Sequence, residues 1–171
     1  MIFKCPIRKG LLNIGYRSLG FTDPCYERTI WDVDGNIIIR REVNIGMGSR
    51  IIVHGTLDFE DGFTITGESS IICMNSIHFG HNVLISWKCQ FLDSDFHTIC
   101  YKDEPKANIC EQIVVGNNIW IGNGCNIYKG AVIPDGCVIA ANSKITRNLE
   151  DSDCLYGNNN KLIKRHITWK Q

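Results

Sequence analysis

Aliphatic residues recur at every sixth position in the C-terminal half of the chain, at Ile109, Val115, Ile121, Ile127, Ile133, Ile139 and Ile145. A period of six fits neither the 3.6-residue repeat of a helix nor the two-residue alternation of an ordinary strand. It is typical of a solenoid in which six residues form one flat side of each coil, the hexapeptide pattern of parallel β-helices. The spacing therefore predicts an all-β chain of short strands stacked coil on coil.

A second column of apolar and small residues supports this prediction. It follows the first by four positions, at Ile113, Ile119, Cys125, Ala131, Cys137 and Ser143. An even offset puts both columns on one face of an extended segment, pointing into the coil. Glycine, or Asn and Asp next to glycine, falls at the expected corners, where positive φ angles are needed. A β-sandwich is the alternative interpretation, but its strands would be spaced irregularly by about 8–12 residues.

The six-residue register also shows where the repeat is interrupted. It continues upstream through Cys73, Phe79, Ile85 and Phe91, and further back it slips by two at Ile39, Ile45, Ile51, Leu57 and Phe63. An irregular coil is expected around Leu57–Ile65. Between Phe91 and Ile109 the pattern is absent, which predicts a loop over residues 93–108 that leaves the solenoid wall. Long loops in compact domains are usually functional or disordered.

This pattern predicts one domain over residues 1–171, with an N-terminal cap (1–36), a repeat body (37–147) and a C-terminal tail (148–171). Lys plus Arg equals Asp plus Glu at 18 each, so no overall field favours nucleic acid. A membrane-spanning run and a signal segment are both missing from the sequence, which favours a cytoplasmic protein. Of the nine cysteines, Cys73, Cys89, Cys125 and Cys137 fall in inward columns, which favours reduced thiols over a disulfide framework.

Three segments resemble the hexapeptide-repeat acyltransferases, most closely the O-acetyltransferases of sugars and surface polysaccharides. They are ISWKCQFLDSDFHTI, VVGNNIWIGNGCNIYKGAVIPDGCVIAANSKITRNL and YGNNNKLIKR. The resemblance covers about residues 37–165 and implies a left-handed parallel β-helix, normally a homotrimer, that uses acetyl-CoA. Left-handedness rests on the resemblance alone, because β crossovers are generally right-handed.

The best candidate for a catalytic base is His97, at the root of the predicted loop and directly after Asp93 and Asp95. Acyl transfer to a hydroxyl needs a base for the hydroxyl proton, and histidine suits this task near neutral pH. A carboxylate on the far ring nitrogen would fix the tautomer and stabilise the imidazolium. If the strand stays extended, alternation places Asp93, Asp95 and His97 on one face. The alternative is that all three are solvated loop residues.

The other histidines are expected to lack a comparable carboxylate; they are His54, His78, His81 and His166. A carbonic anhydrase of the same solenoid type would need three zinc-binding histidines, and only His78 and His81 lie close in sequence, so no metal site is predicted. Asn75, one coil before the loop, is a candidate for binding the acceptor and equally a plain turn residue.

The resemblance also implies residues that bind acetyl-CoA. Trp120 in IWIG matches a family tryptophan along the acetyl-CoA cleft, and the alternative is an ordinary surface aromatic. Thr146 and Arg147 match a family Thr-Lys pair, with arginine offering a bidentate fork for a phosphate. Lys161 and Arg165 match basic positions of the family's C-terminal motif, or else form a solvated basic patch.

The repeat and the resemblance together leave two functions of different class, and the first is the one that the resemblance implies. The first is acetyl transfer from acetyl-CoA to a hydroxyl of a sugar or glycan precursor, in a direct ternary-complex reaction; an N-acetyltransferase of an amino-sugar nucleotide is a close variant. A ping-pong route through cysteine is disfavoured, because Cys89 is expected to be buried and Cys100 has no base beside it. The second function is a non-catalytic solenoid that serves as a binding scaffold.

Overall fold

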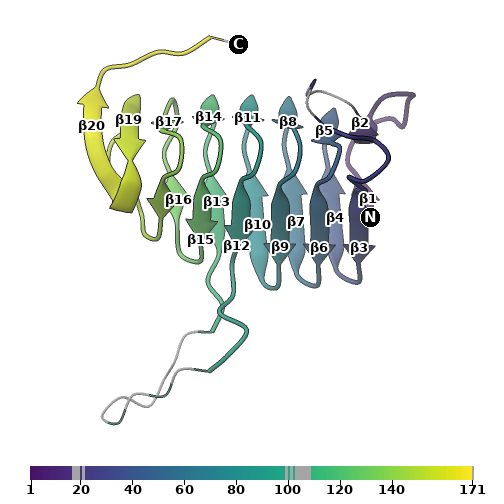
Figure 1. Ribbon diagram of the computed structural model, residues 1–171, viewed down its shortest axis with the longest axis horizontal. Coiled ribbons are helices and arrows are strands. Elements are labelled where there is room, and N and C mark those ends of the chain that lie inside the picture. Colours follow the sequence, from purple (N-terminus) through teal and green to yellow (C-terminus); the bar gives the residue numbers. More distant parts are fainter. Residues whose placement is uncertain (17–19, 21, 99, 101, 103–108, 171) are drawn as a thin grey trace.

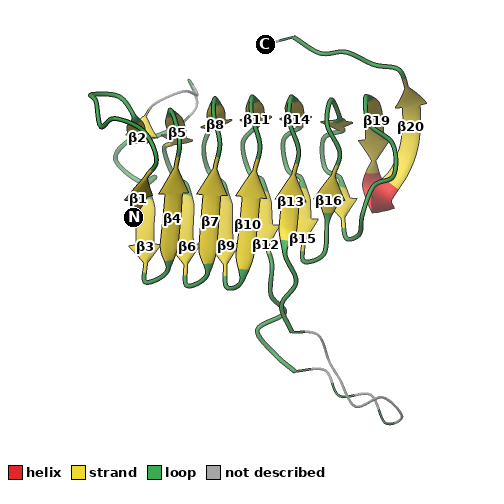
Figure 2. Cartoon of the chain, turned by 180° about the vertical axis from the view of Figure 1, so that it is seen from behind, coloured by secondary structure: helices red, strands yellow, loops and turns green. Residues whose placement is uncertain are grey.

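The computed structural model describes residues 1–16, 20, 22–98, 100, 102 and 109–170, and nearly all regular structure in them is strand. The strands form three sheets, which are the sides of a triangular prism, and the chain winds around its axis coil by coil (Figure 1 and Figure 2). Neighbouring strands pair in parallel, apart from the last pair, β19 and β20. The prediction of a parallel β-helix is confirmed.

Up to β18 each sheet takes every third strand, and the last two strands both join the second sheet. The first sheet contains β1 (Ile2–Phe3), β4 (Asn36–Ile39), β7 (Thr56–Phe59), β10 (Ser76–Phe79), β13 (Ile113–Val115) and β16 (Val132–Ile133). The second contains β2 (Leu12–Tyr16), β5 (Val43–Gly46), β8 (Phe63–Ile65), β11 (Val83–Ile85), β14 (Ile119–Ile121), β17 (Val138–Ile139), β19 (Cys154–Gly157) and β20 (Lys161–Arg165). The third contains β3 (Ile30–Val33), β6 (Arg50–Val53), β9 (Ser70–Cys73), β12 (Gln90–Leu92), β15 (Asn126–Tyr128) and β18 (Lys144–Ile145). A short 3-10 turn, η1 (Asn158–Asn160), joins β19 to β20.

Both predicted inward columns lie in the core, with one exception. From Ile113 to Ile145 all column members are buried, whereas Ile109 lies outside the strands and is only half-buried. Upstream the core holds four phenylalanine rings with centroids 4.5–5.6 Å apart, from Phe59, Phe63, Phe79 and Phe91. Burying such a side chain stabilises the fold by roughly 1.5–3 kcal/mol, so the stacked columns hold the prism together.

The coils of the two halves differ in length. Upstream, Ile37 pairs with Leu57 and Leu57 with Ile77, so a coil takes twenty residues. Downstream, Ile121 pairs with Ile139, so a coil takes eighteen. The irregular coil predicted around 57–65 is therefore wrong, because β7 and β8 pair regularly and the shift of phase recurs in every upstream coil.

The two extra upstream residues lie at the corner where the third sheet passes into the first. We call this corner the loop edge; its described residues are 34–35, 54–55, 74–75, 93–98, 100, 102, 109–112, 129–131 and 146–148. The predicted loop leaves the prism at this edge, between β12 and β13 (Figure 1). Of the range 93–108, residues 99, 101 and 103–108 lie outside the described residues.

The chain after β20 turns back along the prism. The Ile167 N–H donates to the Asp153 carbonyl at 2.9 Å, and the Trp169 Nε1–H donates to the Asn118 carbonyl at 2.7 Å. The segment therefore runs from the last coil toward β14, as Figure 1 shows. Among the residues that the structure describes, no helix has the length and apolar character needed to cross a membrane.

Candidate active site

A short antiparallel stalk forms the root of the loop. Ser94 and Cys110 form an isolated antiparallel bridge, and the Asp95 N–H donates to the Ile109 carbonyl at 2.9 Å. These contacts close the loop beside the prism wall, which explains why Ile109 is displaced from the core column. The stalk ends two residues before His97, so it controls where this histidine leaves the prism.

Asp93 is a buried anchor of this corner. Its side chain is fully buried, and its carboxylate accepts backbone N–H bonds from Met74 at 2.7 Å, Asn75 at 2.8 Å and Ser76 at 2.8 Å. Three such donors satisfy a charge that would otherwise be costly to bury. Burial raises the pKa of the neighbouring Cys73 thiol to about 12, and the negative charge of Asp93 adds to the shift.

Asp93, Asp95 and His97 do not share one face, so that prediction is wrong. The strand β12 ends at Leu92, and Phe96 has a positive φ of 60°, which breaks the alternation. Asp93 points into the core while Asp95 and His97 are exposed.

Asp95 has a partner of its own at the loop edge. Its Oδ2 accepts a hydrogen bond from the Lys129 Nζ at 2.5 Å, with side chains 36 % and 24 % exposed. Within the described residues the His97 side chain makes no hydrogen bond. Asp95 is therefore the accessible carboxylate of the two, and its pairing with His97 stays a prediction.

Further predicted site residues lie along the same edge. Asn75 is exposed at the corner one coil before the loop. Thr146 and Arg147 occupy the last corner, where Thr146 N–H donates to Asn160 Oδ1 at 2.9 Å and Asn160 Nδ2 donates to Thr146 Oγ1 at 3.1 Å. A shallow hollow of about 340 Å³ lies there, lined by Glu111, Gly130, Thr146, Arg147 and Asn148.

Trp120 lies elsewhere, on the outer surface of the second sheet. It is 40 % exposed, and its Nε1–H donates to Ser86 Oγ at 3.3 Å. In a three-sided prism the second sheet is the side opposite the corner between the first and third sheets. One chain therefore does not bring Trp120 to the same surface as His97 and Thr146.

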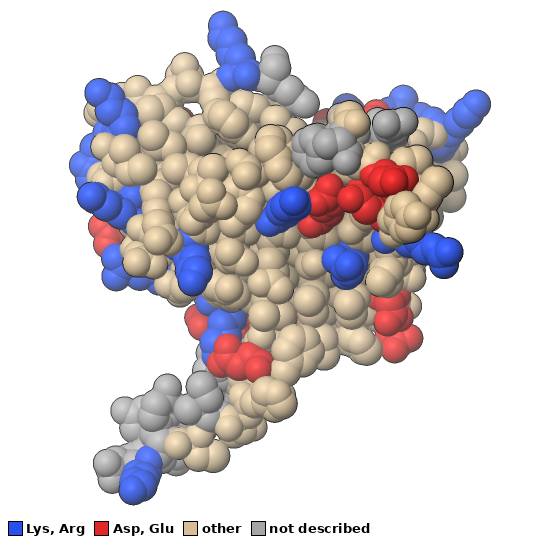
Figure 3. Space-filling model, in the orientation of Figure 1, with Lys and Arg blue, Asp and Glu red and all other residues tan. Residues whose placement is uncertain are grey.

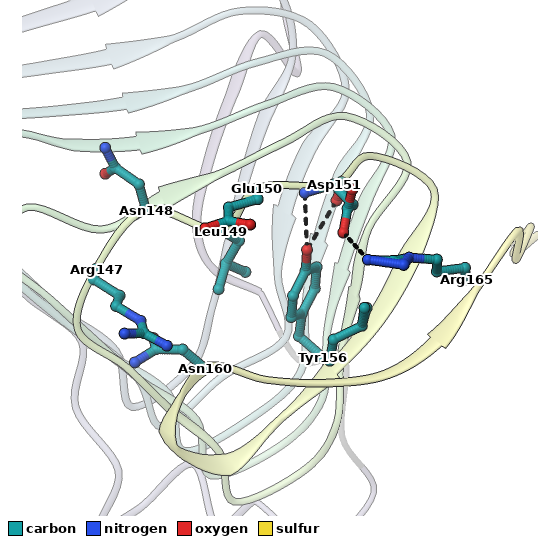
Figure 4. Close-up of a pocket in the computed structure, with 9 residues that line it drawn as sticks. Arg147, Asn148, Leu149, Glu150, Asp151, Tyr156, Asn160 and Arg165 are labelled. Carbon is teal, nitrogen blue, oxygen red and sulfur yellow. Dashed lines mark hydrogen bonds and ion pairs between the residues drawn. The ribbon is translucent and has the colours of Figure 1, made fainter.

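The basic residues of β20 stand at the C-terminal end of the prism. Lys161 is exposed, and Arg165 Nη2 donates to Asp151 Oδ2 at 2.7 Å. In Figure 4 this ion pair lies on one side of a pocket of about 160 Å³, with Arg147 and Asn160 on the other side. Lys and Arg side chains gather over this end in Figure 3.

His78 corrects one expectation, because it does have a carboxylate partner. His78 Nδ1 lies 3.5 Å from Asp58 Oδ2, and with Glu60 these residues bring possible metal-binding atoms within 4.8 Å of one another. The Arg40 guanidinium bonds to Asp58 and lies 3.4 Å from a Glu60 oxygen, so the two carboxylates already share one positive charge. His54 likewise has Nδ1 3.8 Å from Asp34 Oδ2.

Sequence reasoning missed Lys129 and Asn160. Lys129 follows β15, where the chain next returns to the loop edge after the loop, so counting corners along the repeat would have placed it next to Asp95. Asn160 comes from η1, and only the folding of the C-terminal hairpin brings it to Thr146.

The chain is similar to several known proteins. No family model matches it. It is 34 % identical over 167 residues to the "uncharacterized 24.8 kDa protein in cps region" of Klebsiella pneumoniae, covering 94 % of this chain and 70 % of that protein. It is 25 % identical over 154 residues to the "putative lipopolysaccharide biosynthesis O-acetyl transferase WbbJ" of Escherichia coli K12, covering 84 % and 76 %.

A solved structure shares the fold. The polysialic acid O-acetyltransferase OatWY superposes with a TM-score of 0.67 at 15 % identity, over 94 % of this chain and 90 % of that one. The fold is thus the left-handed parallel β-helix of these acetyltransferases, as the resemblance implied.

Proposed function

Because the chain belongs to the hexapeptide-repeat acyltransferases of the sugar O-acetyltransferase type, we propose that it transfers the acetyl group of acetyl-CoA to a hydroxyl of a sugar or surface-polysaccharide precursor. One observation carries the proposal. Asn75, Asp95, His97, Thr146 and Arg147 lie along a single edge of the prism, the edge at which the loop between β12 and β13 leaves it. A base, a carboxylate and a cation gathered at one corner are suited to acyl transfer.

His97 acts as the general base in this proposal. Its exposed imidazole takes the proton of the acceptor hydroxyl while the oxygen attacks the thioester carbonyl. The C–S bond then breaks, and the imidazolium returns the proton to the leaving thiolate, so no acyl-enzyme forms. Asp95 is the carboxylate that orients the imidazole, since the Asp93 carboxylate is already saturated by backbone donors.

The remaining residues bind and position the two substrates. Arg147, Lys161 and Arg165 supply positive charge for the phosphates of acetyl-CoA, and Trp120 packs along its apolar arm. Thr146 lies beside Arg147 at the loop edge and is held there by Asn160. Asn75 is exposed on the other side of the loop, where it is available to bind the acceptor.

The proposal includes a homotrimer. Because Trp120 and the loop edge lie on opposite sides of one prism, a complete site needs the second sheet of a neighbouring copy to face this edge. Three prisms around a threefold axis provide this contact three times, as closed cyclic symmetry requires. We also propose a cytoplasmic location, where thiols such as those of Cys25 and Cys100 stay reduced.

The experiment compares His97→Asn with His78→Asn and His81→Asn, by acetyl-CoA-dependent thiol release with a panel of sugars and polysaccharide fragments. We expect His97→Asn to lower kcat/KM by about 10²- to 10⁴-fold, the usual contribution of a general base. The His81 variant should keep full activity, because this residue lies between β10 and β11, at the corner between the first and second sheets and away from the loop edge.

Two results would contradict the proposal. If His78→Asn loses activity and His97→Asn retains it, the general base is His78, paired with Asp58, and not His97. A folded wild type that releases no thiol with any hydroxyl or amine acceptor would instead indicate a binding scaffold.

A further inference from the structure

Two tryptophans that are far apart in sequence meet on the outer surface of the second sheet. The Trp120 and Trp169 rings have centroids 6.3 Å apart and planes inclined at 42°. Trp120 comes from β14, and Trp169 from the segment that turns back after β20 (Figure 1). This distance lies within the range at which aromatic rings attract each other.

The polar atoms of both rings already have protein partners. Trp120 Nε1–H donates to Ser86 Oγ, and Trp169 Nε1–H donates to the Asn118 carbonyl at 2.7 Å. These bonds fix how the rings lie, so what they offer a ligand is their π-faces and edges. Trp120 is 40 % exposed and Trp169 is half-buried, so part of both rings is accessible. A flat or apolar group is the kind of ligand that such a pair accepts.

On the outer surface of this sheet, one column of paired residues changes from aromatic to aliphatic to basic. The registers place Trp120 next to Val138, Val138 next to Leu155, and Leu155 next to Lys164. With strands about 4.8 Å apart, the exposed Lys164 is roughly 14 Å from Trp120. Val138 is only 7 % exposed and Leu155 is half-buried, so the accessible parts of the column are the aromatic pair at one end, the half-buried Leu155, and the exposed cation at the other end. These groups suit an amphipathic ligand with an apolar arm and an anionic head.

We infer that Trp169 is a second binding residue for acetyl-CoA, which forms one aromatic platform with Trp120, and that residues 166–170 act as the strap that holds it in place. The inference rests on the proposed function, because acetyl-CoA is the ligand that it assigns to Trp120. The Ile167–Asp153 and Trp169–Asn118 hydrogen bonds fasten the strap at both ends. Trp169 packs beside Trp120 on the second sheet, and an indole has no group that takes up or releases a proton near neutral pH, so it serves binding and not the chemical step.

The test measures the Kd for CoA alone by titration calorimetry on the full chain, together with KM for acetyl-CoA and kcat. The variants are Trp169→Ala, Trp169→Leu, Trp169→Phe and Trp120→Ala. Tyr26→Ala is the matched control, an aromatic residue 84 % exposed at the other end of the chain. We expect Trp169→Ala and Trp169→Leu to raise the Kd and KM about three- to tenfold with kcat within twofold. Trp169→Phe, which keeps a ring but loses the N–H, should raise the Kd about twofold.

The outcomes separate the inference from the proposed function. If Trp120→Ala weakens CoA binding and the folded Trp169→Leu and Trp169→Phe variants do not, the inference is wrong while the proposed function stands. If the Trp169 variants bind CoA more tightly, the strap covers the site instead of forming it, and the inference is also overturned. If the wild type binds no CoA and releases no thiol, the proposed function itself fails.

Discussion

The upstream coils (residues 36–92) and the downstream coils (113–145) build the same three sheets from different repeats. Upstream coils take twenty residues and place one more inward residue directly before the loop edge, Val53 at the end of β6 and then Cys73 at the end of β9. Downstream coils take eighteen and have no such residue. Asp93 is next in the upstream series, because Phe91 pairs with Ile71.

The same position thus holds Val53, then Cys73, and in the last twenty-residue coil Asp93. The change from an aliphatic residue to a thiol and then to a carboxylate ends directly before the loop. The loop edge is therefore the corner of the prism at which residues can be added or replaced. Adding two residues per coil, or a whole loop, at this corner leaves the registers of the other two corners intact.

The largest expected effect comes from removing the loop while keeping its stalk. Replacing residues 97–108 by a short Gly-Asn-Gly turn removes His97 but retains the Asp95–Ile109 bond. We expect thiol release to fall at least about 10²-fold, since the general base is lost. The thermal midpoint by circular dichroism should stay within a few degrees, because no core column is touched. A shortened variant that keeps its activity would place the chemistry outside the loop edge.

Asp93→Val tests whether the carboxylate anchors the corner. The substitution restores the residue type that Val53 has at the same position of an earlier coil. We expect a loss of about 3–5 kcal/mol in the free energy of unfolding, because the Met74, Asn75 and Ser76 N–H groups lose a charged acceptor. Urea denaturation measures this loss. Cys73→Val, the matched change one coil earlier, should cost less than about 1.5 kcal/mol. Equal losses in the free energy of unfolding for the two variants would mean that Asp93 only fills space in the inward column and does not anchor the corner.

Lys129→Met distinguishes a functional from a structural role for the Asp95–Lys129 pair. Since both side chains are partly exposed, we expect the free energy of unfolding to change by less than about 1 kcal/mol. If the pair positions Asp95 beside His97, kcat should fall several-fold to about tenfold with KM for acetyl-CoA unchanged. Lys88→Met, which breaks an exposed ion pair with Glu68 away from this edge, is the control. An unchanged kcat in Lys129→Met would make the pair a surface contact only.

The smallest expected effect concerns alkaline pH. Burial raises the pKa of Cys73 to about 12 and that of Cys137 to about 11, from 9.0. Between pH 9 and 11 the folded state therefore holds protons that the unfolded state has lost, so stability falls as the pH rises. A Cys73→Val/Cys137→Val variant should show a shallower fall in chemical denaturation. At pH 8 an alkylating reagent should modify exposed Cys25 and Cys100 and leave these two unmodified.

Much of the fold could be predicted because inward positions obey a local rule. Ile121, Ile127 and Ile133 are recognisable from spacing alone, since every coil buries the same face. The rule failed at Ile109, which keeps the spacing but belongs to the stalk. The rule also wrongly predicted an irregular coil around residues 57–65. A coil of twenty residues is not a multiple of six, so a regular upstream coil shifts the phase of a six-residue repeat.

The candidate site was predictable in composition and not in arrangement. Asp93 and Asp95 were both placed beside His97, yet one is buried under three backbone donors and the other is bonded to Lys129. Neither partner is near in sequence, so no local pattern pointed to it.

The sequence by itself determined the period of six, the inward columns of the prism and the point where both are interrupted. It could do so because neighbours within a few positions decide which alternate residues are buried. Only the tertiary structure decided which residues meet. Stacking the coils brings Asp93 to Met74, Asp95 to Lys129 and Thr146 to Asn160, and the folded-back chain end brings Trp169 to Trp120. These contacts join residues 14 to about 50 positions apart, a separation over which the lengths of the intervening coils, and not the local pattern, set the geometry.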